Sequence, residues 1–329
     1  MEKTLRQMIQ VQNLSRSFGA LQAVRGISFE VAEGEVFGLL GPNGAGKSTT
    51  IKMLVTLLAP HGGSIMVNGF DACRQKAEVR KSIGIIFQDP SLDDRLTAVE
   101  NLYFHARLYH IPRESIQERI DHALEVMGLE DRAGSLVQTF SGGMKRRLEI
   151  ARGILHTPKI LFLDEPTLGL DPQTRHLLWK HLKQLQELEK LTIVLTTNYI
   201  EEAEICQRIA VLDFGRIIAL DTPNALKHRL GSELIILETD DNARAAELIQ
   251  DRLKIEAEVR SRELVIAAAD GAGIMRELFG LLGGSIRKVD IHGPTLEDVF
   301  IDLTGRTMRD EKASRVERMR RAAKMRRRI

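Results

Sequence analysis

The stretch Gly41 to Thr49 reads Gly-Pro-Asn-Gly-Ala-Gly-Lys-Ser-Thr, and it lies between the apolar run Val36 to Leu40 and the helix-like run Lys47 to Leu58. A glycine-rich segment between a strand and a helix predicts a phosphate-binding loop. Glycines let backbone N–H groups turn inward around phosphate oxygens, because residues with a Cβ resist the positive φ values of such a nest. The N-terminus of the following helix favours negative charge at the same place. The sequence therefore predicts a nucleoside triphosphate site.

Each residue of this loop has an expected part in binding ATP and Mg²⁺. Lys47 would neutralise the β- and γ-phosphates, Ser48 would offer its hydroxyl to Mg²⁺, and Thr49 would support the loop. The backbone of the remaining residues would surround the phosphates: Gly41, Pro42, Asn43, Gly44, Ala45 and Gly46. A glycine-rich turn without a ligand is the alternative, which the flanking strand and helix disfavour.

Two adjacent carboxylates follow a second apolar run. Ile160 to Leu163 reads as a buried strand, and Asp164 and Glu165 follow it directly. Parallel sheets present ligand-binding groups at the carboxyl ends of their strands. Asp164 would hold Mg²⁺, and Glu165 would take a proton from the attacking water as the general base. An acidic surface turn is the alternative, and the nearby phosphate loop makes it the weaker one.

Composition is that of a globular protein in a reducing compartment. The 329 residues are 43% hydrophobic and 28% charged, and no run approaches the ~18 apolar residues that a membrane span needs. The N-terminus shows no secretory signal pattern, so we expect a cytoplasmic protein. Cys73 and Cys206 match no metal or redox spacing, and we expect two reduced thiols.

Patterns along the chain predict an α/β fold with two domains, because a single core rarely grows beyond ~300 residues. Residues 9–40 alternate like antiparallel strands, and residues 92–157 look like a helical insertion that opens with a Thr97–Glu100 capping box. Strands and helices then alternate as in a parallel sheet. A break near Asp221 separates a first domain, 1–222, from a small α+β domain, 223–305, with the order strand, helix, two strands, helix, strand.

A third segment has the form of a capped helix start. Phe140-Ser141-Gly142-Gly143-Met144 opens a helix-like run to about His156, and Ser141 would cap that helix while the glycines leave its N-terminus open to an anion. Alone, such a start is more often only a cap. Together with the loop and the two acids, it makes residues 8–222 resemble the ATP-binding cassette ATPases, the motor subunits of transporters. The resemblance implies a P-loop NTPase core with an antiparallel β subdomain and a helical insertion.

The resemblance also implies roles for further residues. Phe18 is placed to stack on adenine, although a core position is the alternative. Gln88 matches the glutamine that senses Mg²⁺ and contacts the membrane partner, and Asp171 lies in the loop that crosses between two subunits. Ser141, with Gly142 and Gly143, matches the segment that contacts nucleotide held by the opposite subunit. A dimer of two copies with two nucleotides between them is therefore expected.

One position departs from the family pattern. Asn198, in Thr196-Thr197-Asn198-Tyr199, stands where such ATPases usually carry histidine. An amide can donate a hydrogen bond to γ-phosphate but cannot become cationic near neutral pH. We therefore expect slow hydrolysis with Glu165 still acting as the base.

The C-terminal part carries a narrower resemblance and a basic tail. Residues 294–300, Pro-Thr-Leu-Glu-Asp-Val-Phe, followed by Leu303-Thr304-Gly305, resemble ATPase subunits of the daunorubicin-resistance type, which work with separate permeases, mostly in export. Residues 306–329 hold eleven Lys/Arg against three Asp/Glu, a net +8 that leaves −6 for the rest of a +2 chain. This tail is either solvated or a basic amphipathic helix on anionic lipid.

Three functions follow from these observations. The leading one is the ATP-hydrolysing motor of a membrane exporter, peripheral on the inner face of the cell membrane. A soluble ATPase acting on nucleic acid or ribosomes is the second, but only 94 positions separate Lys47 from Ser141 and one cassette is present, so no nucleic-acid partner is expected. A slowly hydrolysing nucleotide-dependent regulator is the third, and Asn198 motivates it.

Overall fold

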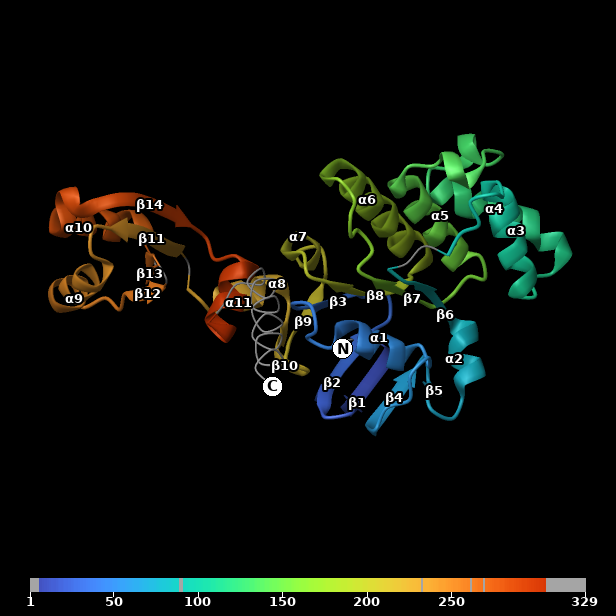
Figure 1. The fold of residues 1–329 in the computed structure, drawn as a ribbon, viewed down its shortest axis with the longest axis horizontal. Helices are drawn as coiled ribbons and strands as arrows, with labels where there is room; N and C mark the ends of the chain where they lie inside the picture. Colours follow the sequence, from blue (N-terminus) through green and yellow to red (C-terminus); the bar gives the residue numbers. More distant parts are fainter. Residues whose placement is uncertain (1–5, 89–90, 232, 261, 269, 306–329) are drawn as a thin grey trace, which may run out of the picture. The chain divides into compact units, whose positions relative to one another are not determined.

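A computed structural model describes residues 6–88, 91–231, 233–260, 262–268 and 270–305, and Figure 1 shows their arrangement into elements. The chain divides into two compact units between Leu220 and Asp221. The basic tail, 306–329, lies outside the described residues, so both expectations for it stay predictions. No helix among the described residues combines the length and the apolar character that crossing a bilayer requires.

An antiparallel sheet forms one layer of the first unit. Its strands lie in the order β2 (Leu21–Ala32), β1 (Gln7–Phe18), β4 (Gly62–Val67) and β5 (Phe70–Asp71). Ile27, Phe29 and Val31 are buried while Ser28 and Glu30 are exposed, as the two-residue period of a strand requires. The alternation therefore correctly predicted β1 and β2. The strand at Val36–Leu40 belongs instead to the second sheet.

The second sheet carries the site. Its strands lie in the order β10 (Arg216–Asp221), β9 (Arg208–Asp213), β3 (Val36–Leu40), β8 (Thr192–Thr197), β7 (Ile160–Asp164) and β6 (Ile83–Ile86). The strands from β9 to β6 are parallel to their neighbours. β3, β7 and β8 are buried along their whole length. Their carboxyl ends meet at one edge, which brings together the loops that follow them.

Helices cover this second sheet, with α5 and α6 on one side and α1 between the two sheets (Figure 1). The helices of the first unit are α1 (Lys47–Leu54), α2 (Lys76–Ser82), α3 (Ala98–Leu108), α4 (Arg113–Val126), α5 (Gly142–Ile154), α6 (Pro172–Glu189) and α7 (Ile200–Ala203). The capping box is confirmed: Thr97 Oγ1 accepts from Glu100 N at 3.2 Å, and Glu100 Oε2 accepts from Thr97 N at 2.8 Å. The expectation of a helix to Leu58 was wrong, because Thr56 turns the chain with φ 65°.

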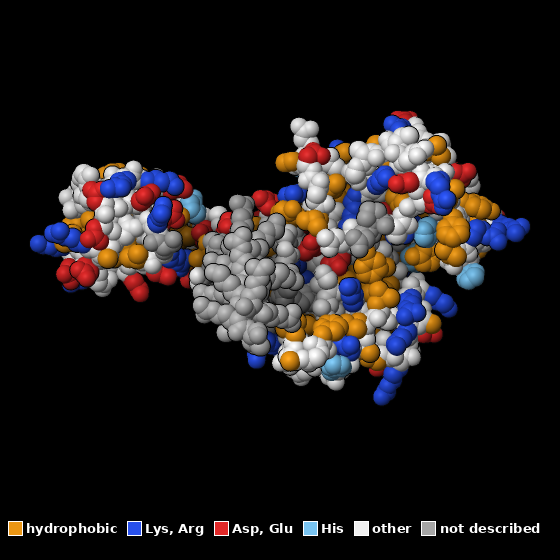
Figure 2. All heavy atoms as spheres, viewed as in Figure 1, with side chains coloured by type: hydrophobic (Ala, Val, Ile, Leu, Met, Phe, Trp, Pro, Cys, Tyr) orange, Lys and Arg blue, Asp and Glu red, His pale blue; other side chains and the backbone are white. Residues whose placement is uncertain are grey.

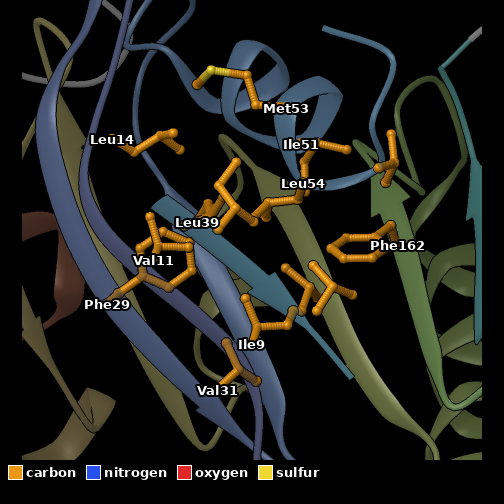
Figure 3. Packing of buried hydrophobic residues seen from close by; sticks show 14 of the residues in the cluster. Ile9, Val11, Leu14, Phe29, Val31, Leu39, Ile51, Met53, Leu54 and Phe162 are labelled. Carbon is orange, nitrogen blue, oxygen red and sulfur yellow. The ribbon is translucent and has the colours of Figure 1, made fainter. Parts of the chain in front are cut away.

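The core of the first unit fixes the helix that follows the phosphate loop. Figure 3 shows side chains from both sheets and α1 packed together: Ile9, Val11, Leu14, Phe29, Val31, Leu39, Ile51, Met53, Leu54 and Phe162. Ile51 and Leu54 of α1 are fully buried in this cluster. Each contributes about 2 kcal/mol by leaving water, so α1 is firmly anchored. The loop at its N-terminus therefore has a fixed position.

The second unit is a small α+β fold. Its elements are α8 (Pro223–His228), β11 (Glu233–Thr239), α9 (Asn242–Leu253), β12 (Glu258–Arg260), β13 (Glu263–Ala268), α10 (Gly271–Leu282), β14 (Ile286–His292) and α11 (Leu296–Thr304). The strands lie antiparallel in the order β12, β13, β11, β14. β11 to β14 with their helices make the βαββαβ arrangement of ferredoxin-like folds. The predicted order is confirmed, whereas α8 and α11 were not foreseen.

Candidate functional site

The loop of residues 41–49 needs glycine at two positions for space. A Cβ on Gly41 would lie 2.3 Å from the carbonyl oxygen of Leu212, and one on Gly46 would lie 2.6 Å from that of Ala23. Gly44 and Gly46 also have φ of 86° and 104°, which L side chains rarely adopt. The turn ends where α1 begins at Lys47. This conformation is the one expected of a loop whose backbone binds an anion.

Lys47 is almost completely buried at the start of α1, with 4% of its surface exposed. Its Nζ donates to the carbonyl oxygens of Gly41 at 2.7 Å and Pro42 at 3.0 Å, and it lies 3.7 Å from Glu165 Oε1. A buried ammonium is costly unless such acceptors surround it. The loop therefore holds a positive charge against its own backbone, at the N-terminus of a helix.

Three hydroxyl and carboxylate groups meet at the ends of β7 and β8 and the start of α1. Ser48 Oγ donates to Asp164 Oδ1 at 3.0 Å, and Thr196 Oγ1 donates to the same oxygen at 2.5 Å. Asp164 is buried. The hydroxyl of Thr196 also accepts a hydrogen bond from the backbone N–H of Glu165 at 3.0 Å. Thr196 thus orients both acids. The sequence analysis did not predict Thr196 as a site residue, because in the sequence it is one of several β-branched residues typical of a strand.

Glu165 has an unusual backbone. Its φ is 48°, uncommon for a residue other than glycine, and its N–H donates to the carbonyl oxygen of Thr196 at 3.2 Å. Such a conformation costs about 1–3 kcal/mol and tends to occur at functional sites. It places the carboxylate beside the Lys47 ammonium, with 12% of the side chain exposed. A carboxylate held here can accept a proton from a water at the loop.

Arg146 on α5 connects the separate parts of this site, and the sequence reading missed it. Its guanidinium donates to the carbonyl oxygens of Phe87 at 2.5 Å, Pro166 at 2.7 Å and Asp164 at 3.3 Å. It also pairs with Glu149 at 2.9 Å, and both side chains are buried. Glu149 in turn accepts from the N–H of Ser91 at 2.8 Å. One side chain thereby fixes the ends of β6 and β7 to α5.

The start of α5 forms a second group of predicted site residues. Ser141 is the N-cap, and its Oγ accepts from Met144 N at 3.2 Å, so the predicted cap is confirmed. A Cβ on Gly143 would lie 2.1 Å from Thr174 Cγ2. Thr174 in turn donates from N and Oγ1 to the exposed Asp171, and these hydrogen bonds lower the pKa of that carboxyl. Ser141 and Gly142 are exposed, so this helix start faces away from its own core.

The remaining predicted residues lie at the rim. Gln88 is exposed two residues after β6, and Asn198 directly follows β8 with its Oδ1 buried and without a hydrogen-bond partner among the described residues. Phe18 is 47% exposed at the end of β1, under the Arg16 guanidinium at 5.1 Å. The alternative that Phe18 is a core residue is therefore wrong. An exposed ring remains available for stacking.

A buried carboxyl lies on α7, the short helix that follows Asn198 in the chain. Glu202 on α7 is 1% exposed and accepts a hydrogen bond from the hydroxyl of Thr167, in the loop after β7. Burial raises the pKa of Glu202, although the Thr167 hydrogen bond opposes this shift. Trp179 on α6 is also buried, and it too lowers the pKa of Glu202. The loops after β7 and β8 are thus joined through a side chain outside the predicted set.

The residues at this sheet edge fit a magnesium-bound triphosphate. The glycine turn and Lys47 supply N–H groups and one cation for phosphate, while the Ser48 hydroxyl and the Asp164 carboxylate, 3.0 Å apart, supply the oxygen ligands that Mg²⁺ prefers. Glu165 stands beside them as a candidate base. The arrangement suits phosphoryl transfer to water.

Comparison with protein families gives two matches. The family described as "ABC transporter" matches residues 24–168, and the family described as "ATP-binding protein DrrA1-3-like, C-terminal domain" matches residues 222–304.

Three characterised relatives match over nearly the whole chain. The linearmycin resistance ATP-binding protein LnrL of Bacillus subtilis is 37% identical, covering 92% of this chain and all of the relative. A Nod factor export ATP-binding protein I of a Rhizobium species is 41% identical over 91% of this chain and 98% of that protein. The daunorubicin/doxorubicin resistance ATP-binding protein DrrA of Streptomyces peucetius is 39% identical over 90% of this chain and 92% of that protein.

Solved structures resemble about two thirds to three quarters of the chain. Subunit cbiO1 of Clostridium perfringens, part of the ABC transporter complex cbiONQ, has a TM-score of 0.64 at 29% identity, covering 75% of this chain and 96% of that one. The dimeric MJ0796 cassette has a TM-score of 0.60 at 28% identity, and its post-hydrolysis state with ADP and Pi has 0.59 at 27%. Each MJ0796 structure covers 65% of this chain and 98% of its own.

Proposed function

Because this chain belongs to the ATP-binding cassette family of transporter ATPases, with the fold and ATPase class that this implies, we propose that it powers a membrane exporter through a separate permease. Its relatives bear names of drug resistance and Nod factor export. By this proposal it works at the inner face of the cell membrane.

One arrangement carries the proposal: at the start of α1 and the end of β7, Ser48 donates to Asp164 and Lys47 lies 3.7 Å from Glu165. Mg²⁺ bound with ATP would screen the phosphate charge. Lys47 would hold the β- and γ-phosphates, and Ser48 with Asp164 would hold the metal. Glu165, kept beside them by its backbone conformation, would take the proton from the attacking water.

The exposed helix start at Ser141 supports a second copy as partner. An N-terminus with a serine cap and two glycines binds anions well, and its own chain leaves Ser141 and Gly142 exposed. In the proposed dimer, this segment and Asp171 complete the site around nucleotide held by the other copy. The related MJ0796 cassette has been solved as a dimer.

An exposed aromatic surface on α3 supports the permease partner. Tyr103, Phe104, Leu108 and Tyr109 are each more than 40% exposed, and Figure 2 shows hydrophobic side chains at this end of the helical subdomain. Contiguous aromatic groups on a surface are typical of protein–protein interfaces. The surface lies on α3, the helix that follows the Gln88 loop in the chain.

The test of the proposed chemistry is a steady-state ATPase assay of the wild type beside Glu165→Gln. Loss of the base should lower kcat by about 10²-fold or more while ATP still binds, since a general base contributes 10²–10⁴. Ser48→Ala should instead weaken Mg²⁺ binding, so that a higher Mg²⁺ concentration is needed for half-maximal activity. Equal rates for wild type and Glu165→Gln would show that Glu165 is not the base.

The test of the proposed assembly is light scattering with saturating ATP and Glu165→Gln, which keeps ATP intact. A dimer is expected under these conditions. The matched variant Ser141→Arg, in the same Glu165→Gln background, places a charged side chain at the helix start, and it should lose the increase in dimer that ATP causes while still binding ATP. A monomer in both proteins would contradict the nucleotide-sandwiched dimer.

A further inference from the structure

β14 is the last strand of the sheet in the second unit, and one of its edges is open. It pairs with β11 from Leu234 opposite His292 to Glu238 opposite Lys288. Among the described residues no strand lies on its other side. The five residues from Arg287 to Ile291 are all exposed. Their backbone N–H and C=O groups on that edge are therefore a template for another strand.

The two edges of this sheet differ in how they are protected. β12, at the opposite edge, is only three residues long, and short edge strands resist pairing. β14 has seven residues and carries two exposed apolar side chains, Val289 at 37% and Ile291 at 40%. It contains no proline and no glycine. By these criteria β14 is suited to accept a strand, and β12 is not.

The sequence of β14 is complementary to itself in one register. When two copies of a strand pair antiparallel about a twofold axis, one residue must lie opposite its own counterpart. With Val289 at that centre, Lys288 lies opposite Asp290 of the second copy, and Asp290 lies opposite Lys288. Both opposite-charge pairs then stabilise the ladder around an apolar Val289–Val289 pair.

Neighbouring registers are unfavourable. A centre at Lys288 places two lysines opposite each other, and a centre at Asp290 places two aspartates opposite each other, which destabilises a strand pair. Within its own sheet Asp290 lies opposite the apolar Ile236. Among the described residues neither Lys288 nor Asp290 takes part in an ion pair or a side-chain hydrogen bond. Lys288 lies opposite Glu238 within its own sheet without forming an ion pair with it, so both charges can pair with a second copy.

We propose that β14 of two copies pair antiparallel about Val289, joining two four-stranded sheets into one of eight strands. The partner is a second copy of this chain, because the strand's charges complement themselves in this register. The contact is distinct from the proposed nucleotide sandwich, since it uses no residue of the ATP site. It therefore persists without nucleotide, and it would keep two copies associated after ATP has been hydrolysed.

Charge reversal tests the pairing. Sedimentation equilibrium of the full chain without nucleotide, in a Lys47→Ala background that prevents ATP binding, should show a monomer–dimer equilibrium. Lys288→Glu and Asp290→Lys should each raise the dimer dissociation constant about tenfold, because two attractive pairs become repulsive. The double variant Lys288→Glu/Asp290→Lys restores opposite charges and should return the constant to near its starting value.

Cysteine cross-linking tests the register. In a Cys73→Ser background, where the remaining Cys206 is buried, Val289→Cys should form a disulfide-linked dimer on oxidation, since directly opposite Cα atoms lie about 4.5–5.5 Å apart. Ile291→Cys is the matched control. Its counterpart would lie four residues along the ladder, about 13 Å away, too far for a disulfide.

Two results would overturn the proposal. One is a full chain that stays monomeric without nucleotide, which would leave β14 to a strand from another protein. The other is equal cross-linking at residues 289 and 291, which would show random collision. Neither result bears on ATP hydrolysis, so the proposed ATPase function stands or falls separately.

Discussion

At the scale of single residues, Asn198 stands where the resemblance leads us to expect histidine. It follows β8 directly, and its Oδ1 is buried without a hydrogen-bond partner among the described residues. The amide can donate through Nδ2, but it cannot carry a proton between groups as imidazole does. Glu202 on α7 does not replace that function, because its carboxyl is buried against Thr167.

Asn198→His should therefore increase the ATPase rate several-fold. The gain should depend on pH with an inflection near 6.5, the usual pKa of histidine, whereas the wild-type rate should lack that inflection. The measurement is kcat between pH 5.5 and 8.5 for wild type, Asn198→His and Asn198→Ala. If Asn198→Ala kept both the wild-type rate and the wild-type ATP affinity, residue 198 would have no role.

The sequence alone could predict those residues whose function is indicated by their immediate neighbours in the chain. Lys47 and Ser48 are recognisable because the glycines around them and the flanking strand and helix are contiguous in the chain. Arg146 and Thr196 are different, since their partners are backbone carbonyls and a carboxylate 18 to 59 positions away. Nothing local marks such contacts: Arg146 reads as one cation in a solvated basic run.

At the scale of elements, α5 is held to the sheet through the buried Arg146. Four backbone carbonyls at the ends of β6 and β7 accept from this guanidinium, and so does the carboxylate of Glu149 on α5 itself. A fork of five donors satisfies them at once, which an ammonium cannot do. The helix start at Ser141 is therefore fixed relative to Asp164 and Glu165 by one side chain.

Arg146→Ala should lower the free energy of unfolding by about 3–5 kcal/mol, the usual cost of removing one partner of a buried pair. Arg146→Lys should retain much of the stability but lower kcat, because the ammonium cannot bind all the carbonyls. Urea unfolding and steady-state kinetics measure the two effects. Arg95 is exposed and pairs with Asp93, so Arg95→Ala is the control and should change neither quantity by much.

The exposed aromatic helix α3 contains a histidine that responds to acid. Burial lowers the pKa of His105 to about 4, and the charge of Arg152 adds to the shift. The unfolded chain binds this proton near pH 6.5 and the folded chain only near 4. Between these values the unfolded state holds more protons, so stability falls as pH falls.

His105→Gln should therefore reduce the loss of unfolding free energy between pH 7 and pH 5. The difference should stay well below the ~1.4 kcal/mol per pH unit that one proton can contribute, because the ring is partly exposed and screened. Urea titrations at both pH values measure it, with the exposed His110→Gln as control. An unchanged pH dependence would contradict the lowered pKa of His105.

At the scale of the whole molecule, the two units have separate hydrophobic cores. The sequence predicts both units in outline. For the second unit the prediction depends on the strand and helix periodicities in residues 234–291. The order β12, β13, β11, β14 could not be predicted, because it depends on pairings between distant segments such as Leu234 with His292. The open edge of β14 is thus visible only in the folded chain.

Separate cores predict two unfolding transitions in calorimetry, of which ATP should raise only one. A ligand at 100 times its dissociation constant stabilises its own unit by about 2.7 kcal/mol. The experiment uses Glu165→Gln with Mg²⁺ and ATP, so that ATP persists during the scan. Lys47→Ala should show two transitions and no shift with ATP. A single transition, or an equal shift of both, would show that the units unfold together.

Trp179 is the single tryptophan of the chain, and it is buried in α6, the helix that Asp171 caps. Ultraviolet emission excited at indole wavelengths therefore originates from one known position in the first unit, and residues 221 onward are silent in that signal. Melting followed by this emission isolates one of the two calorimetric events without an added dye. In stopped-flow experiments the same Trp179 emission would report changes around α6 while nucleotide binds.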